Sequence, residues 1–243
     1  MKTFGRSHRG LVRARNEDGY LMRPMGFRGF LLAVADGIGG GPGGQEASRV
    51  ALQALDDAAG VDVRDLARLV SAVAMANRQV FEAGQHGMEG MGTTLTAAVI
   101  FSDRLLLAHV GDSRAYQVLS DHVVRLTIDH SVAGEMERAG SITADEAAHH
   151  PRRNVLTRWV GSFDKVRIDV LDIAWNAESR LLLCTDGLTS VLNDEEISQT
   201  CRLTGGQALV DRLIDTALQR GGPDNITVVL ADVVTEAGDG DGR

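Results

Sequence analysis

The sequence predicts an α+β fold: two stacked antiparallel β-sheets flanked on both sides by pairs of α-helices, an α-β-β-α sandwich. Two observations carry this prediction. Strand-like apolar runs outnumber helical segments, and several follow one another with only short turns between them, which is typical of antiparallel pairing. The helical segments are amphipathic, so each has one face to pack on a sheet. With 44% apolar but only 4% aromatic residues, the chain can bury a sizeable core built mainly from Leu, Val, Ala and Ile.

The first half of the chain contains one clear strand and two helices. The run FLLAVA at 30–35 predicts a buried strand that ends before Asp36-Gly37. Apolar residues recur at helical spacing over 45–59 and 66–83, which predicts two consecutive helices.

Strand-like stretches dominate the middle of the chain, where short turn sequences separate them. Their spacing predicts an antiparallel meander. The four stretches are 93–101, 104–110, 115–119 and 123–127.

Residues 130–160 are polar, helical and irregular, with HHPRRN at the centre, and we interpret them as an excursion on the rim of the sheets. Beyond this excursion we expect strands at 166–173, 181–185 and 226–234 and a helix at 207–219. The whole is expected to form one domain over residues 1–235. The tail at 236–243 is expected to be disordered because of its composition.

Composition excludes several classes of protein. A net charge of -8 without a basic patch argues against a nucleic-acid partner held by its phosphates. No segment approaches the roughly 20 apolar residues of a membrane span, and the N-terminus lacks the apolar stretch of a signal peptide. The two cysteines, Cys184 and Cys201, form no CxxC pair or disulfide framework. We therefore expect a monomeric cytoplasmic protein with no membrane or nucleic-acid partner.

Aspartates stand at the ends of the apolar strands. Asp36 follows FLLAVA, Asp112 follows LLLAHVG, Asp186 follows LLLCT, and Asp224 precedes ITVVLADVV. In antiparallel neighbours, the end of one strand and the start of the next share a sheet edge, so these four acids can converge. Carboxylates gathered away from water repel one another, so such a cluster requires cations. Oxygen ligands favour Mg²⁺, Mn²⁺ or Ca²⁺ over zinc.

Two further features accompany these acids. Gly37 and Gly187 each follow an Asp, and a residue without Cβ lets its carbonyl approach an ion, although a simple Asp-Gly turn is the better explanation of any one pair taken alone. In the stretch VRARNED, Glu17 and Asp18 either join the cluster while Arg13 binds an anion, or form a solvated turn. The sequence alone leaves both alternatives open.

Taken together, these segments resemble the metal-dependent protein phosphatases of type 2C, particularly their compact bacterial members. The resemblance extends from about residue 10 to residue 233, and the motifs stand in the order found in the family. The matching segments are GLVRARNED (10–18), AVADGIGGGPGGQEAS (33–48), GMGTTLTAAV (90–99), HVGDSRAY (109–116), LLLCTDGLT (181–189) and GGPDNITVVLADV (221–233).

The resemblance implies a site for two Mn²⁺ or Mg²⁺ ions at one end of the sandwich. Asp36 would bridge the two ions. Asp186 and Asp224 would complete the coordination of one ion, and Glu17 and the Gly37 carbonyl that of the other. Asp186 would also share a third ion with Asp112, as in many bacterial relatives.

The resemblance also implies the reaction, which is hydrolysis of phosphoserine and phosphothreonine by direct attack of metal-activated water. Asp18 would orient this water, Arg13 would hold the substrate phosphate, and residues 130–160 would form the family's flap beside the cleft. Ile38 stands where many eukaryotic members have the histidine proposed as general acid, so that role must fall elsewhere, with metal-bound water as the candidate. Phosphoproteins targeted by a serine/threonine kinase, or the kinase itself, would be the partners.

Two alternative functions come from other classes. Gly39, Gly41 and Gly44 satisfy the GxGxxG pattern of a dinucleotide-binding oxidoreductase, but the later strands do not repeat as βαβ units. The second alternative is a catalytically inactive regulatory module on the same fold, although every expected acid is present.

Other reactive side chains offer no competing site. The adjacent pair His149-His150 cannot face one side of a helix, and His109 and His130 are interpreted as structural. Cys184 lacks the glycine-rich phosphate-binding loop that a cysteine nucleophile would need.

Overall fold

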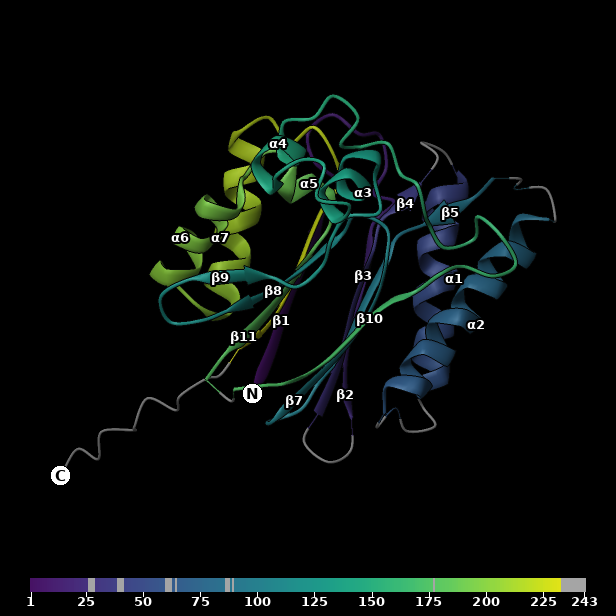
Figure 1. Cartoon of the computed structure of the whole chain (residues 1–243), viewed down its shortest axis with the longest axis horizontal. Coiled ribbons are helices and arrows are strands. Elements are labelled where there is room, and N and C mark those ends of the chain that lie inside the picture. Colours follow the sequence, from purple (N-terminus) through teal and green to yellow (C-terminus); the bar gives the residue numbers. More distant parts are fainter. Residues whose placement is uncertain are drawn as a thin grey trace.

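The computed structural model describes residues 1–25, 29–38, 42–59, 63, 65–85, 88, 90–176 and 178–232. Two five-stranded sheets are stacked at the centre of the molecule, and helices cover both outer faces (Figure 1). Every strand pairing in these ranges is antiparallel. The α-β-β-α sandwich expected from the sequence is therefore confirmed.

The first sheet has the strand order β1-β12-β11-β8-β9 and the second the order β10-β7-β6-β3-β2. A short pair, β4 with β5, stands apart from both. The strands of the first sheet are β1 (Lys2–His8), β12 (Ile226–Asp232), β11 (Arg180–Cys184), β8 (Arg114–Val118) and β9 (Val123–Arg125). Those of the second sheet and the pair are β10 (Asp169–Ala174), β7 (Arg104–Val110), β6 (Leu95–Ile100), β3 (Gly29–Ala35), β2 (Gly19–Met25), β4 (Gly37–Ile38) and β5 (Gly92–Thr93).

Two helices cover each sheet. The second sheet carries α1 (Pro42–Ala59) and α2 (Leu66–Gly84), and the first carries α6 (Asp194–Leu203) and α7 (Gly206–Gln219) (Figure 1). Three short helices, α3 (Val132–Arg138), α4 (Ala144–Ala148) and α5 (Asp186–Thr189), lie together at the upper end of the sandwich in that view.

Alternation of side chains along the strands divides the core into three layers. On β11, Leu181 and Leu183 face the other sheet, whereas Leu182 and Cys184 face α6 and α7. Because both faces of these central strands are buried, their sequences are almost continuously apolar, and this is why they are recognisable in the sequence.

Several predicted elements differ from the observed ones. The expected meander is wrong beyond its second strand, because the chain crosses from β7 in one sheet to β8 in the other through the turn at Gly111. The stretch 93–101 is divided into β5 and β6 at Thr94, whose N–H donates to the Asp36 carbonyl instead of a ladder partner. The prediction also missed the two edge strands β1 and β2 and the polar helix α6.

The expected excursion at 130–160 contains α3 and α4 and returns to the sandwich through two isolated bridges, Ser131 with Leu156 and Thr93 with Val160. The predicted tail at 236–243, and the end of the last predicted strand, lie outside the described residues. In the part of the chain that the structure describes, no helix combines the length and apolarity needed to cross a bilayer.

Truncating a side chain between the sheets tests this layering. Leu183 is fully buried there, so Leu183→Ala should lower the free energy of unfolding by about 2–5 kcal/mol, measured by urea denaturation. Val170→Ala, at a half-exposed position on β10, should change it by less than about 1 kcal/mol. Similar losses in both variants would contradict the stacked arrangement.

Candidate active site

Five aspartates gather at one end of the sandwich, and they come from both sheets rather than from one sheet edge as the sequence suggested. Asp18 and Asp36 flank β2 and β3 of the second sheet, and Asp186 and Asp224 flank β11 and β12 of the first. Asp112 lies on the turn between the sheets. Their charges act on one another, Asp36 on Asp18, Asp112 and Asp186, and Asp186 on Asp224.

Asp36 and Asp186 interact directly through their carboxyl groups. Desolvation raises the pKa of Asp36 well above its ordinary value, and repulsion from Asp18 and Asp186 raises it further. Desolvation and repulsion from Asp224 also raise the pKa of Asp186, although a hydrogen bond from Asp36 lowers it in part. The charge of Asp186 therefore raises the cost of ionising Asp36.

Asp18 has one satisfied and one unsatisfied oxygen. Its Oδ2 accepts hydrogen bonds from Thr185 Oγ1 at 2.8 Å and Thr227 Oγ1 at 2.7 Å. Its Oδ1 is buried and has no hydrogen-bond partner. Burial raises the pKa of Asp18 to about 7, even though both threonine hydroxyls favour its ionised form. A buried acceptor without a partner costs free energy, so this oxygen is suited to a water or an ion.

Glu17 is buried between tightly packed backbone segments. Its N–H donates to Asn225 Oδ1 at 2.8 Å, and its carbonyl accepts from Ser48 Oγ at 2.6 Å and Gly37 N at 3.2 Å. A Cβ on Gly44 would lie 2.5 Å from Glu17 Oε2, and one on Gly37 would lie 2.3 Å from the Gly44 carbonyl oxygen. Glycines are therefore required here for close packing around Glu17.

The GxGxxG pattern is explained in part by this packing. Gly44 has the structural role just described, whereas Gly39 and Gly41 lie outside the described residues. Gly187 also has a packing role that differs from the predicted approach to an ion, because a Cβ there would lie 1.9 Å from the Asn225 carbonyl oxygen.

Arg13 forms a salt bridge with Asp224 instead of extending freely into solvent. Its Nη2 donates to Asp224 Oδ2 at 2.7 Å, and nearly half of the Arg13 side chain is exposed. A guanidinium has five N–H donors, so this contact leaves donors for a phosphate group. The salt bridge places these donors at the rim of the carboxylate cluster.

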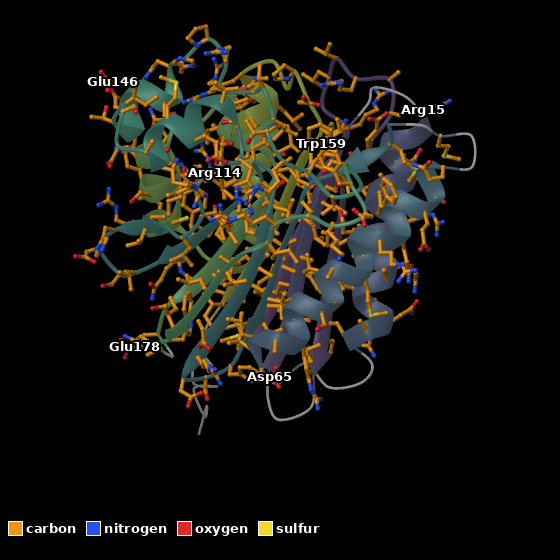
Figure 2. The ribbon with its side chains drawn as sticks, turned by 45° about the vertical axis from the view of Figure 1, so that its right-hand side comes forward. Arg15, Asp65, Arg114, Glu146, Trp159 and Glu178 are labelled. Atoms are coloured by element: carbon orange, nitrogen blue, oxygen red, sulfur yellow. The ribbon has the colours of Figure 1, made fainter. Side chains whose placement is uncertain are left out.

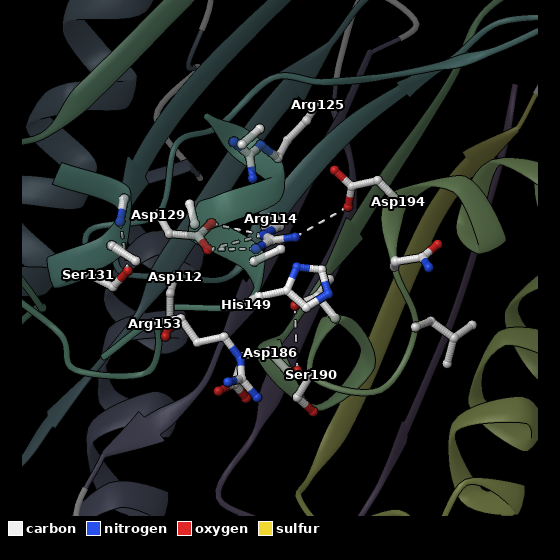
Figure 3. A pocket seen from close by; sticks show the side chains of 18 of the residues that line it. Asp112, Arg114, Arg125, Asp129, Ser131, His149, Arg153, Asp186, Ser190 and Asp194 are labelled. Atoms are coloured by element: carbon white, nitrogen blue, oxygen red, sulfur yellow. Dashed lines mark hydrogen bonds and ion pairs between the residues drawn. The ribbon is translucent and has the colours of Figure 1, made fainter. Parts of the chain in front are cut away.

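Asp112 lines a groove of about 820 Å³ between α3 and α4 on one side and α5 and α6 on the other, and Asp186 also lines it (Figure 3). Desolvation raises the pKa of Asp112 well above its ordinary value, and repulsion from Asp186 and Asp129 adds to the shift. Arg114 opposes this repulsion, and its guanidinium bonds to both oxygens of Asp129. Arg114 lies towards the same end of the molecule as Arg15, and away from Asp65 and Glu178 (Figure 2).

The side chains of this cluster fit hard divalent cations. All are oxygen donors, they repel one another, and Asp18 Oδ1 has no partner. Across the described ranges, no group of three or more His, Cys, Asp or Glu side chains stands in an arrangement that could hold an ion.

The sequence analysis missed the residue that connects these segments. Asn225 Nδ2 donates to the carbonyls of Arg9 and Arg15, both at 2.8 Å, while its Oδ1 accepts from Glu17 N. Asn225 therefore fixes the loop that carries Arg13 and Glu17 against the start of β12. Its place directly after Asp224 in a matched motif was the available signal.

The cysteines are unsuited to nucleophilic catalysis. Both are buried, and burial raises the pKa of the Cys184 thiol above its ordinary value and that of Cys201 to about 11. The nucleophile is the thiolate, which neither residue readily forms.

A cluster of buried and half-buried carboxylates beside an arginine is an arrangement suited to metal-dependent hydrolysis of phosphate esters. The family described as Protein phosphatase 2C matches residues 4–231, and the chain belongs to this family. The resemblance inferred from the sequence is thus confirmed.

Curated relatives are named as serine/threonine phosphatases. The chain is 41% identical over 242 residues to the serine/threonine protein phosphatase PstP of Mycobacterium tuberculosis, covering 96% of this chain and 45% of the relative. It is 35% identical to the serine/threonine phosphatase stp of Listeria innocua, covering 93% of this chain and 94% of that relative. The chain thus spans less than half the length of the mycobacterial relative and almost all of the Listeria one.

Solved structures share the fold. The Mycobacterium tuberculosis serine/threonine phosphatase PstP/Ppp superposes with a TM-score of 0.87 at 36% identity, covering 96% of this chain and 99% of that one. Stp1 of Staphylococcus aureus superposes with a TM-score of 0.89 at 30% identity, covering 96% and 95%. The catalytic domain of PstP in complex with two manganese ions gives 0.84 at 36% identity, covering 96% and 98%.

Removing the Asn225 side chain should destabilise the site. Asn225→Ala leaves three backbone groups without their partner, so the free energy of unfolding should fall by about 2–4 kcal/mol in urea denaturation. Asn176→Ala removes a single exposed turn contact with Glu178 N and should cost less than about 1 kcal/mol. A loss for Asn225→Ala as small as that for Asn176→Ala would contradict this role.

Proposed function

We propose that this protein is a serine/threonine protein phosphatase that hydrolyses phosphoserine and phosphothreonine with two Mn²⁺ or Mg²⁺ ions. The observation that carries the proposal is the cluster of mutually repelling, half-buried carboxylates centred on Asp36 and Asp186, with Arg13 at its rim. The names of the relatives and the two manganese ions in a PstP structure support the same function.

The alternatives have less support. An inactive regulatory module would not need its acids gathered and desolvated, an arrangement that costs free energy without a ligand. A dinucleotide-binding site would need parallel βαβ units, whereas the pairings of β3 with β2 and β6 are antiparallel.

The proposed ligand assignment follows the cluster. Asp36 would be shared by the two ions, with Asp186 and Asp224 on one side and Glu17 and the Gly37 carbonyl on the other. Asp112, with Asp186, would hold a third ion. When bound, a pair of such cations lowers the pKa of water and offsets the charge of the phosphate.

The protein's own groups would orient the reactants. Asp18 Oδ1 would orient the attacking water by accepting a hydrogen bond from it, because this oxygen is buried and has no other partner. Arg13 would donate to the non-bridging phosphate oxygens through the N–H groups that Asp224 leaves available. The groove between the flap and α5–α6 offers room for the polypeptide on either side of the phosphorylated residue.

The cellular setting is proposed by analogy. Substrates would be phosphoproteins modified by a serine/threonine kinase, or the kinase itself, encountered by a monomer in the cytoplasm. Mn²⁺ and Mg²⁺ both suit the oxygen ligands.

A phosphopeptide assay tests the proposed activity. With Mn²⁺, phosphate should be released from phosphoserine and phosphothreonine peptides and only slowly from a phosphotyrosine peptide, and EDTA should abolish release because the water is no longer activated. Activity that survives exhaustive chelation, or acts on phosphotyrosine alone, would overturn the proposal. Arg13→Ala should lower kcat/KM by about 10²-fold, whereas Arg15→Ala, an exposed arginine of the same loop, should keep it.

Thermal unfolding tests the metal assignment without relying on turnover. Mn²⁺ at about 100 times its Kd should stabilise the folded protein by about 2.7 kcal/mol over the EDTA-treated form. Asp36→Asn should lose this increment, while its Tm in EDTA should stay level or rise because one repelling charge is gone.

Asp172→Asn is the matched control, since Asp172 lies on β10 and forms its ion pair with Arg104 of β7. It should keep the Mn²⁺ increment. An Asp36→Asn variant that Mn²⁺ stabilises as much as the parent protein would refute the role of Asp36.

A further inference from the structure

His130 is fully buried at the start of the flap and contacts the turn that carries Asp112. Its Nδ1 accepts a hydrogen bond from Gly111 N at 3.0 Å, and its own backbone N–H donates to the Gly111 carbonyl at 2.7 Å. Gly111 directly precedes Asp112 and has a φ of 115°, so its backbone geometry aims the following carboxylate. His130 thus holds this turn from two sides.

The contacts of the ring assign its tautomer. Because Gly111 N–H is a donor, Nδ1 must carry a lone pair and Nε2 the proton. Nε2 lies 3.1 Å from Asp169 Oδ2, the acceptor that this tautomer requires. Arg158 Nη1 is also 3.0 Å from Nε2, a contact between two donors that is tolerated because both bond to the Asp169 carboxylate. The two ring nitrogens therefore have different tasks.

Asp169 connects the ring to the flap. Its Oδ1 accepts from Arg158 at 2.7 Å, and its Oδ2 lies 2.6 Å from Arg138 Nη2. Burial disfavours the charged carboxylate, but the hydrogen bonds from His130 and Arg158 and the charge of Arg138 outweigh it and hold the pKa of Asp169 well below its ordinary value. Arg138 ends α3, and Arg158 lies in the irregular segment that returns to the sandwich, so Asp169 bonds to both the outgoing and the returning part of the flap.

The backbone makes the same connection. Thr157 N donates to the His130 carbonyl at 2.8 Å, and Val132 N donates to the Val155 carbonyl at 2.9 Å. The outgoing and returning arms of the flap therefore meet at His130, the same residue that bonds to the turn carrying Asp112.

We infer that His130 is a positioning residue that sets the place of the Asp112 carboxylate through Nδ1 and couples it to the flap through Nε2. It touches neither substrate nor ion. The inference rests on the proposed function, because Asp112 and the flap lie on either side of the same groove. A change in the position of the flap is then transmitted to Asp112 through a single ring.

Two substitutions separate the two nitrogens. The Oδ1 of Asn stands near the position of Nδ1, and the amide nitrogen of Gln reaches the position of Nε2. His130→Asn should keep the hydrogen bond from Gly111 N and lose the contact with Asp169. His130→Gln should keep the contact with Asp169 and lose the hydrogen bond from Gly111 N. Amide hydrogen exchange at Gly111 measures the first bond without any turnover.

His130→Gln should accelerate Gly111 exchange by about tenfold, the loss of roughly one hydrogen bond. It should also raise the Mn²⁺ concentration for half-maximal activity and lower kcat on a phosphothreonine peptide while leaving KM near its original value. His130→Asn should keep Gly111 exchange and the Mn²⁺ requirement and instead raise KM, because the flap is released. Asp169→Asn should reproduce this KM effect and leaves the His130 ring in place.

His109→Asn is the matched control. The ring centroid of this buried histidine lies 4.6 Å from that of His130, with the two rings tilted by 38°, and its Nδ1 is hydrogen-bonded to Thr96 Oγ1. The variant therefore disturbs packing without removing a hydrogen bond to Gly111. It should not alter Gly111 exchange. Equal effects of the Asn and Gln variants at position 130, scaling only with their loss of Tm, or unchanged Gly111 exchange in His130→Gln, would overturn the inference. If the parent protein cleaves no phosphopeptide, the proposed function fails, and Gly111 exchange with calorimetric Mn²⁺ binding still decides the role of His130.

Discussion

Repulsion among desolvated carboxylates is the constraint on which the rest of the active site depends. Asp18, Asp36, Asp112 and Asp186 all have raised pKa values because they are withdrawn from water close to one another. The fold offsets part of this cost with threonine hydroxyls on Asp18 and with two arginines, Arg13 and Arg114. Divalent cations would remove the rest, so the electrostatic repulsion among the carboxylates favours cation binding.

The two-sheet sandwich makes this concentration of charge possible. Strands from both sheets end at the same edge of the molecule, and their buried apolar cores hold the ends in place. Because each acid follows or precedes a rigid strand, its backbone cannot retreat from its neighbours. Asn225 adds a third tie by fixing the loop of Arg13 and Glu17 to β12. His130 is where the flap meets this rigid end.

Some elements had no recognisable signal, for physical reasons. β1 and β2 are edge strands whose residues are mostly half-buried, and Pro24 and Arg23 interrupt the apolar pattern of β2. α6 has few apolar residues, although the capping box formed by Asn193 and Glu196 marks its start. By contrast, the bounds of β7 and the end of α7 were predicted correctly, since their burial imposes a clear period.

By itself the sequence determined the layered fold class and the acids at strand ends, because burial and side-chain periodicity are properties of local segments, and its ordered motifs resembled the family. Tertiary structure alone decided that the acids come from two different sheets, that Arg13 bonds to Asp224, and that Asn225 and His130 tie distant loops together. Such contacts join residues up to 216 positions apart, and a hydrogen bond between them leaves no trace in the spacing of either segment.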